Sequence, residues 1–367
     1  DCTGFGQAVK DISMKGIFME KSLKKDIIIN RLPVVIYFIL IFAALIVIIS
    51  AVAPMSNHEP KTTDTYSDFS TGWLNCEESE ASLDHLSGTT VIHRTITAAD
   101  CNKTLFFFAK TSNIKVFIDG VCQYRNNHFC SQFFGKTPGA LFVNVLIPAE
   151  SDGKLLEIEI ENPYKDDDSA KLDEMYIGDI SDIIQFQQQK RFNSFCISFI
   201  IMVLGVVMLL LFIPLTRQKI VGIEFLNLGV TAFVSGLYLT TDGRYLQLVF
   251  GDAHIYHVIA ETALRLSILP FLIFLSQMYE SYSKRISAIL CVIGEIAFAG
   301  CFIGEITEIM DYHETLFLVH VVFAISMLFI LVSTIKGIVK APKENIYHNI
   351  GCIVLSFMAM TDIIILW

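Results

Sequence analysis

Long runs of apolar residues, separated by short polar segments, occupy much of the chain. Each run has about 20 residues, the length that a helix rising ~1.5 Å per residue needs to cross ~30 Å of hydrocarbon. The pattern therefore predicts a membrane protein with an α-helical bundle. The seven predicted spans are 32–53, 192–215, 221–240, 255–279, 286–304, 316–335 and 346–367.

The polar stretch between the first two runs, 54–190, follows a different period. In "LLEIEIEN" apolar residues alternate with glutamates, a pattern typical of a strand with one buried and one wet face. "TLFFFAK", "IKVFIDG" and "ALFVNVLIP" are further strand candidates, and Asp119-Gly120 is a candidate hairpin turn. Several short strands in one such stretch predict an all-β sandwich.

Basic residues indicate how the predicted spans are oriented, because Lys and Arg accumulate on the cytoplasmic side. This places 1–31 in the cytoplasm, makes 32–53 a transmembrane anchor and puts the β-sandwich outside the cell. A signal peptide cleaved after Ala53 is the alternative for the first run. The basic residues on the predicted inner side are Lys21, Lys24, Lys25, Arg31, Arg217, Lys219, Lys284, Arg285, Lys336, Lys340 and Lys343.

Composition agrees with this division. The chain is 53% hydrophobic and 17% charged, with a mean hydropathy of +0.55. Residues 54–190 contain 21 acidic and 11 basic side chains, an imbalance equal to the net charge of −10 of the whole chain. An acidic outer domain argues against a nucleic-acid partner, since phosphate backbones require a basic surface.

Motifs for enzymatic chemistry are missing from the sequence. It contains no nucleophile elbow, P-loop, zinc signature or glycine-rich phosphate loop, so we expect no enzyme, cofactor or metal site. The acidic "KDDDSAKLDE" is expected to be a solvated loop rather than a calcium site. Cys122 and Cys130 flank a candidate hairpin in an oxidising compartment, where they could pair or stay free.

A ligand site in the outer domain would combine an aromatic platform with a few polar groups, as sugar sites do. For any single candidate, an ordinary place in the core or on the surface is the favoured alternative. The candidates are Trp73, Arg94, Tyr124, Arg125, Phe133 and Asn144.

Ionisable residues inside the predicted spans form a second group of candidates, because burial in hydrocarbon is costly. Glu261 and Arg265 are four residues apart and are expected to pair on one helix face. Glu295 lies mid-helix and Asp362 lies deep in the last run. We expect a polar cluster that fixes helix packing, with a signalling or small-molecule site as the alternative.

The loop "YLTTDGRYLQLVFGD" is predicted to lie directly beneath the outer domain. Gly243 is expected to permit the turn, and Asp242 and Arg244 to reach the outer domain or the lipid headgroups. Residues 246–250 are expected to pack as an interfacial segment. We predict a coupling loop rather than a catalytic one, because its side chains are too few and unpaired for acid–base catalysis.

Two segments carry a resemblance to known families. "LFFFAKTSNIKVFIDGVCQYRN…GKTPGALFVNVLIPAESDGKLLEIEIENPY" is similar to the jelly-roll, galactose-binding-like module of carbohydrate-active proteins. With "GLYLTTDGRYLQLVFGDAHIYHV…LRLSILPFLIFL", residues 30–367 resemble bacterial seven-transmembrane receptors with diverse intracellular signalling modules. More narrowly, they are similar to Firmicute versions that end in a GGDEF diguanylate cyclase.

The resemblance implies a multi-pass receptor in a bacterial cell membrane. An outer jelly roll, 54–190, would sense a small molecule or carbohydrate, and the six helices of 191–367 would relay the signal. A second copy of the chain is a further candidate partner. We expect the gene to continue with another span and a cyclase. The alternatives are a transporter or lipid-linked-sugar enzyme using Glu261, Arg265 and Glu295, and an anchored carbohydrate-binding protein.

Overall fold

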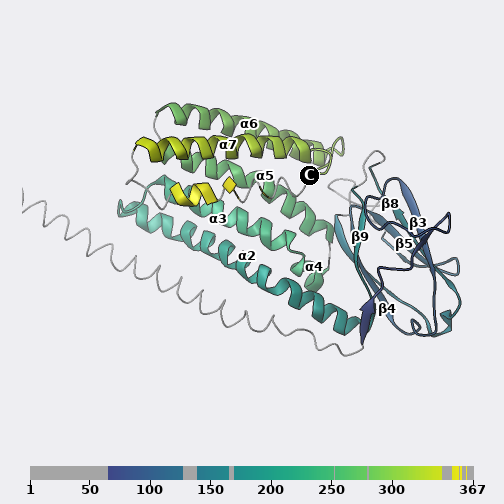
Figure 1. Ribbon diagram of the computed structural model, residues 1–367. Helices are drawn as coiled ribbons and strands as arrows, with labels where there is room; N and C mark the ends of the chain where they lie inside the picture. The colour runs from purple at the N-terminus through teal and green to yellow at the C-terminus, as the bar shows by residue number, and fades with distance from the viewer. Residues whose placement is uncertain are drawn as a thin grey trace, which may run out of the picture.

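The structure, a computed structural model, has a β domain followed by a bundle of long helices (Figure 1). It describes residues 65–126, 139–164, 169–251, 253–278 and 281–340, together with 349–354, 356, 357 and 361. The predicted first span, 32–53, lies outside these residues, and the last run lies only partly within them.

The β domain consists of two antiparallel sheets, which confirms the predicted sandwich. The four-stranded sheet has the order β1 (Tyr66–Asp68), β9 (Lys171–Gly178), β4 (Thr104–Lys110), β7 (Ala140–Leu146). The five-stranded sheet has the order β2 (Leu74–Asn75), β3 (Thr89–Thr95), β8 (Leu155–Glu161), β5 (Asn113–Ile118), β6 (Val121–Arg125). A short 3-10 turn, η2 (Ala149–Ser151), precedes β8. All four strands predicted from sequence are present.

The predicted alternation along β8 is also confirmed. Leu156, Ile158 and Ile160 are fully buried between the sheets, whereas the intervening glutamates are partly exposed. The β5–β6 turn is made by Asp119 and Gly120, which both have positive φ, 51° and 73°. Such angles at both central residues are typical of a tight two-residue hairpin.

The helices that follow are α2 (Ile180–Arg217), α3 (Ile223–Asp242), α4 (Tyr245–Phe250), α5 (Ala253–Met278), α6 (Ser281–Ile306) and α7 (Leu316–Lys340), and the described residues after position 348 are helical as well. All of the labelled helices except α4 are long and apolar enough to cross a membrane, and they coincide with the second to sixth predicted spans. The chain is thus built as a multi-pass membrane protein with a β domain.

The helix α2 begins inside the range that the sequence assigned to the β domain. Only Asp179 separates β9 from α2, and its carboxylate caps the helix by accepting a hydrogen bond from the Ser181 amide at 2.8 Å. The helical part therefore begins at residue 180, before the expected boundary at 190. The first turns of α2 are polar, so a search for apolar runs does not include them.

Close helix packing depends on glycine at two positions. A Cβ atom on Gly205 of α2 would lie 2.3 Å from the Phe233 amide nitrogen, and one on Gly236 of α3 would lie 2.4 Å from that of Met202. These distances are far below van der Waals contact, so α2 and α3 approach at backbone level, as small residues permit in membrane helices.

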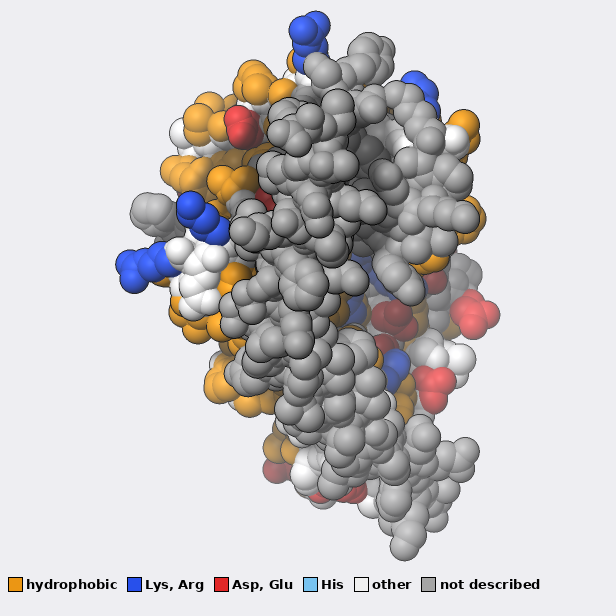
Figure 2. Space-filling model, turned by 90° about the vertical axis from the view of Figure 1, so that its left-hand side faces the viewer, with side chains coloured by type: hydrophobic (Ala, Val, Ile, Leu, Met, Phe, Trp, Pro, Cys, Tyr) orange, Lys and Arg blue, Asp and Glu red, His pale blue; other side chains and the backbone are white. Residues whose placement is uncertain are grey.

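The connections alternate between the two ends of the bundle. The α3–α4 and α6–α7 connections lie at the β domain, and the α2–α3 and α5–α6 connections lie at the opposite end (Figure 1). Figure 2 views that opposite end, where Lys and Arg side chains project beside hydrophobic ones. Of the predicted inner basic residues, Arg217 and Lys219 lie at the α2–α3 connection and Arg285 lies in the first turns of α6, so these three are at that end, and the orientation in a membrane stays a prediction.

Candidate functional site

The four-stranded sheet meets the helices through an aromatic face. Phe106 and Phe108 of β4 are only 1% and 3% exposed although they point away from the sandwich core, and both rings pack on Phe142 of β7 at 5.4 Å. The Arg244 guanidinium lies 4.0 Å above the Phe108 ring, and that of Arg191 lies 5.0 Å from the Phe142 ring. Such cation–π contacts gain strength when they are shielded from water.

An ion-pair cluster joins the same sheet to α2. The carboxylate of Glu174 in β9 accepts hydrogen bonds from Lys190 at 2.8 Å and from Arg191 at 2.7 Å. Burial opposes ionisation of Glu174, but the hydrogen bonds and charges of Lys190 and Arg191 lower its pKa overall. Glu174 therefore stays charged and holds β9 against the helix that begins directly after it.

The predicted coupling loop does contact the β domain. Arg244 reaches Phe108 as expected, and the Asp242 side chain is exposed. Gly243 lies in the turn, as expected, but it keeps right-handed helical angles, and Arg244 takes the positive φ of 63°. The Gly243 amide donates to the Leu239 carbonyl and so continues the helical hydrogen bonding of α3. The backbone changes direction at the next residue, Arg244. The following segment forms α4, whose end at Phe250 is exposed.

A glycine contact links the start of β7 to α5. Gly139 has a φ of +76°, and a Cβ atom there would lie 2.8 Å from the Cβ of His257. Both the backbone angle and the space exclude a side chain at this position. The backbone of the β domain at Gly139 therefore packs directly against the His257 side chain of α5.

The α6–α7 connection makes a further contact with the β domain. The Tyr164 hydroxyl donates to the Asp311 carboxylate, and the Tyr164 ring stacks on His313 at 4.3 Å. Ser169 Oγ lies 3.4 Å from His313 Nε2. Asp311 and Glu314 exchange amide-to-carboxylate hydrogen bonds of 2.9 and 3.0 Å, a capping box that fixes the turn into α7.

A buried arginine lies behind this connection. Arg265 forms the predicted ion pair with Glu261, at 2.5 Å, and also donates to the Tyr312 carbonyl at 2.7 Å. Its guanidinium lies 4.1 Å from the Tyr312 ring. The Tyr312 amide in turn donates to Glu305 at 2.5 Å. The intramembrane pair is thus part of a network that begins at the loop touching the β domain.

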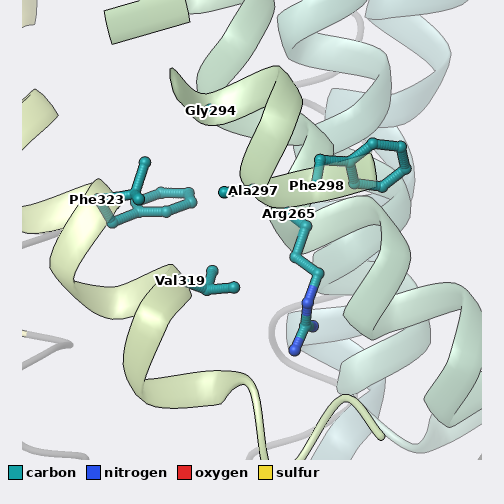
Figure 3. A pocket seen from close by; sticks show the side chains of 7 residues that line it. Arg265, Gly294, Ala297, Phe298, Val319 and Phe323 are labelled. Carbon is teal, nitrogen blue, oxygen red and sulfur yellow. The ribbon is translucent and has the colours of Figure 1, made fainter. Parts of the chain in front are cut away.

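A small cavity adjoins the Arg265 side chain between α5, α6 and α7. Figure 3 shows the guanidinium directed away from Phe298, so that the aliphatic part of Arg265 contributes to the lining. The cavity has about 20 Å³ of room for water-sized atoms, enough for about one water molecule. Its lining residues are Arg265, Gly294, Ala297, Phe298, Val319, Val322 and Phe323.

Two of the proposed sugar-site residues have structural roles. Trp73 is 1% exposed in the sandwich core, and its indole donates to the Phe69 carbonyl at 2.8 Å. Arg94 lies 3.8 Å over the Phe69 ring and donates to the Thr71 carbonyl at 2.6 Å. Trp73 is therefore closed to solvent in this structure and offers no aromatic platform. This is the place in the core that the sequence analysis gave as the favoured alternative.

The remaining sugar-site candidates lie away from Trp73 and Arg94. Tyr124 and Arg125 lie on β6, at the opposite edge of the five-stranded sheet from β2, and Asn144 is exposed on β7 of the other sheet. Tyr124 packs against the core, and burial raises its pKa. Phe133 lies outside the described residues. The described candidates thus form no common sugar site, because they occupy different edges and sheets.

Other sequence-based candidates are scattered. Glu295 lies exposed on α6 and does not join the Glu261–Arg265 pair, and Asp362 lies outside the described residues. Cys122 is an exposed free thiol, but Cys130 lies outside the described residues, so the Cys122–Cys130 disulfide stays a prediction. The described residues hold no metal-binding group of three His, Cys, Asp or Glu.

Several residues of the junction were missed by sequence reasoning. Residues 171–174, expected in a solvated loop, belong to β9, and Glu174 lies where the β4–β9 register shifts. The run of three phenylalanines, 106–108, does carry a signal, since consecutive large apolar residues require burial on both faces of a strand. No local sequence pattern predicts the contact of Tyr164 with Asp311, because the two residues are 147 positions apart in the chain.

Comparisons of the chain with models of protein families, with curated proteins and with solved structures find no match.

Proposed function

We propose that this protein is a transmembrane receptor whose outer β domain binds a ligand and whose helices relay a rearrangement to the cytoplasm. The observation that carries the proposal is the buried junction. Phe106 and Phe108, on the face of a sheet that would be wet in a free sandwich, are covered by helices, with Arg244 stacked on one of them. A domain that was merely displayed on an anchor would not require such a face.

The contacts at the junction suit a reversible switch. Cation–π contacts and ion pairs can be exchanged through side-chain rotation, without unfolding either part. A ligand that favours one arrangement of the β domain would shift the population of helix arrangements by its difference in affinity for the two. The β9 strand and its Glu174 are well placed for this, because β9 continues into α2 after one residue.

A second route leads from the β domain to the centre of the bundle. Tyr164 binds Asp311, whose neighbour Tyr312 accepts a hydrogen bond from Arg265. Because Asp311 and Tyr312 are consecutive, a shift of Tyr164 would displace the carbonyl that Arg265 binds. Arg265 is buried and paired with Glu261, so its network has few alternative partners, which favours discrete states over gradual deformation.

The class of receptor follows from the resemblance, with support from topology. In the proposed jelly roll, the sheet orders 1-9-4-7 and 2-3-8-5-6 each combine strands from the first and the second half of the β domain, as two interleaved Greek keys do. We propose a galactose-binding-like sensor for a small molecule or carbohydrate, outside a bacterial membrane. The basic loops at the far end support this orientation. The proposed output is a cytoplasmic diguanylate cyclase.

The transporter and lipid-linked-sugar enzyme alternatives have less support. They relied on Glu261, Arg265 and Glu295 acting together, and Glu295 lies apart from the other two. The cavity beside Arg265 is also far smaller than the ~300 Å³ of an ordinary small-molecule site.

The proposal can be tested with the full chain in lipid nanodiscs. Spin labels on unnatural amino acids at positions 218 and 285 would report the distance between two cytoplasmic helix ends, during titration with a panel of mono- and disaccharides. We expect one sugar to shift the distance distribution. The shift should disappear in Arg244→Ala and persist in Lys154→Ala, a control that removes a partly exposed basic side chain from the β domain outside the candidate ligand residues.

Two outcomes would contradict the receptor. Sugar binding without any change in the distance distribution would indicate an anchored binding protein. Accumulation of the sugar inside proteoliposomes would indicate a transporter.

A further inference from the structure

The middle of α6 presents a carboxyl group on the outer surface of the bundle. Glu295 lies near the centre of the candidate span 285–306 and is exposed. Its neighbours Val292 and Ile296 are 52% and 68% exposed, as expected of side chains that face lipid. Glu295 makes no hydrogen bond or ion pair with any described residue.

This position differs from those of the other charged residues in the described spans. Glu261 and Arg265 pair with each other, and the remaining charges lie near helix ends, where they can reach water or headgroups. Exposed isoleucine and valine need no partner in a bilayer. A carboxyl group at mid-depth does, because hydrocarbon offers it no hydrogen bond.

We propose that Glu295 marks a homodimer interface, in which α6 packs against α6 of a second copy of this chain about a twofold axis along the membrane normal. Two copies inserted in the same direction bring residues of equal depth together at such an axis. Each Glu295 then faces the partner's Glu295. A hydrogen bond between the two carboxyl groups across the axis gives each of them a polar partner.

Self-pairing also explains how the partner comes to carry a polar group at the required depth. Any other helix would need its own polar side chain at mid-membrane. The predicted first span of this chain does not supply one, because its central residues, 38–49, are all apolar. A second copy supplies the group by symmetry.

The helix surface around Glu295 allows close approach. Ala299 follows Glu295 by one helical turn, lies on the same face and is exposed. A small residue there permits a neighbouring helix to come close. Gly300 is also exposed, with no atom within 4 Å of a Cβ built on it, but it points about 100° further around the helix. Ala299 thus belongs to the proposed interface and Gly300 does not.

The test measures association of the full chain in liposomes. Donor- and acceptor-tagged copies are reconstituted over a range of protein-to-lipid ratios, and energy transfer gives the dimer dissociation constant. We expect Glu295→Val to weaken association at least tenfold. Glu295→Gln, which can still form a pair of hydrogen bonds across the axis, should stay within about threefold of the natural chain.

A pair of adjacent substitutions provides the steric control. Ala299→Phe should weaken association at least tenfold, whereas Gly300→Phe should leave it unchanged, although both add the same ring to the lipid-facing surface. Thermal melting of each variant verifies that the fold is intact.

Three results would overturn the proposal. The first is energy transfer no higher than random proximity at every ratio. The second is equal association of Ala299→Phe and Gly300→Phe. The third is unchanged association of Glu295→Val, which would show that the carboxyl faces lipid or another helix.

Discussion

The two sheets of the β domain share one core but have opposite outer faces. On the five-stranded sheet, the outward side chains of β8 are glutamates, and Glu159 pairs with Lys115 at 2.6 Å in partial contact with water. On the four-stranded sheet, the outward side chains of β4 include Phe106 and Phe108, which are buried, and Arg244 of the α3–α4 connection lies over Phe108. The difference shows which face of the sandwich is committed to the bundle and which is left to solvent.

The sharpest test of this contrast replaces aromatic residues on the two faces of β4. Phe106→Ala should cost about 3–5 kcal/mol, the same as Phe107→Ala in the sandwich core, because both leave a cavity. Glu157→Ala on the wet face should change stability by less than about 0.5 kcal/mol. Chemical unfolding followed by Trp73 fluorescence, in a Trp367→Phe background, measures all three. A small loss for Phe106→Ala would mean that the helices do not cover this face.

The arginine behind the junction should be nearly as sensitive. Arg265→Leu leaves the partly buried Glu261 carboxylate without its partner and should cost about 3–5 kcal/mol. The double change to Glu261→Leu and Arg265→Leu should cost less than the sum of the single changes, because it removes both charges. Melting in detergent gives the values. Additive shifts would show that the pair does not interact in the folded protein.

The glycine at the start of β7 offers a smaller, well-controlled effect. Gly139→Ala and Gly153→Ala both force a side chain into a positive φ, but only the first meets another residue, His257. Gly139→Ala should therefore be less stable than Gly153→Ala by about 1–3 kcal/mol, the range for overpacking. The comparison is a pair of melting curves. Equal losses of stability in the two variants would show that the protein accommodates a side chain at position 139, next to α5, at no energetic cost.

Acid should weaken the junction through Glu174. Its pKa is lowered in the folded protein, so its contribution is fully present above the unfolded value, about 4.3, and is lost as the pH falls through the folded value. Glu174→Gln should cost about 1.5–3 kcal/mol at pH 7, the range for hydrogen bonds to charged groups. The difference from the natural chain should shrink below pH 4. A pH-independent difference in melting would exclude this role.

The smallest effect is expected on the wet face. Lys115→Met removes the partner of Glu159, and both side chains are about one-quarter exposed, so the loss should stay below about 1 kcal/mol. Added salt should reduce it further. A loss as large as that of Glu174→Gln, measured under the same conditions, would remove the contrast between the two faces.

The sequence could predict features that depend on local spacing. Apolar runs located the spans, alternation located β8, and a spacing of four residues paired Glu261 with Arg265. It could not predict the junction, because Tyr164 and Asp311 meet only once the fold brings distant segments together. The start of α2 was missed since its first turns are mostly polar, and only Ile183 and Gln187 are buried there. The left-handed angle fell on Arg244 because helical geometry continued through Gly243.

The length of α2 has a mechanical consequence. Its 38 residues form a rod about 57 Å long, from one residue after β9 to the far end of the bundle. Because its base is clamped to the sheet through Glu174, Lys190 and Arg191, a tilt of the β domain turns the whole rod. By simple trigonometry on that length, a tilt of about 5° would swing the far tip by about 5 Å. In the proposed receptor, the helix would thus act as a lever that converts a small tilt of the β domain into a large displacement at Arg217.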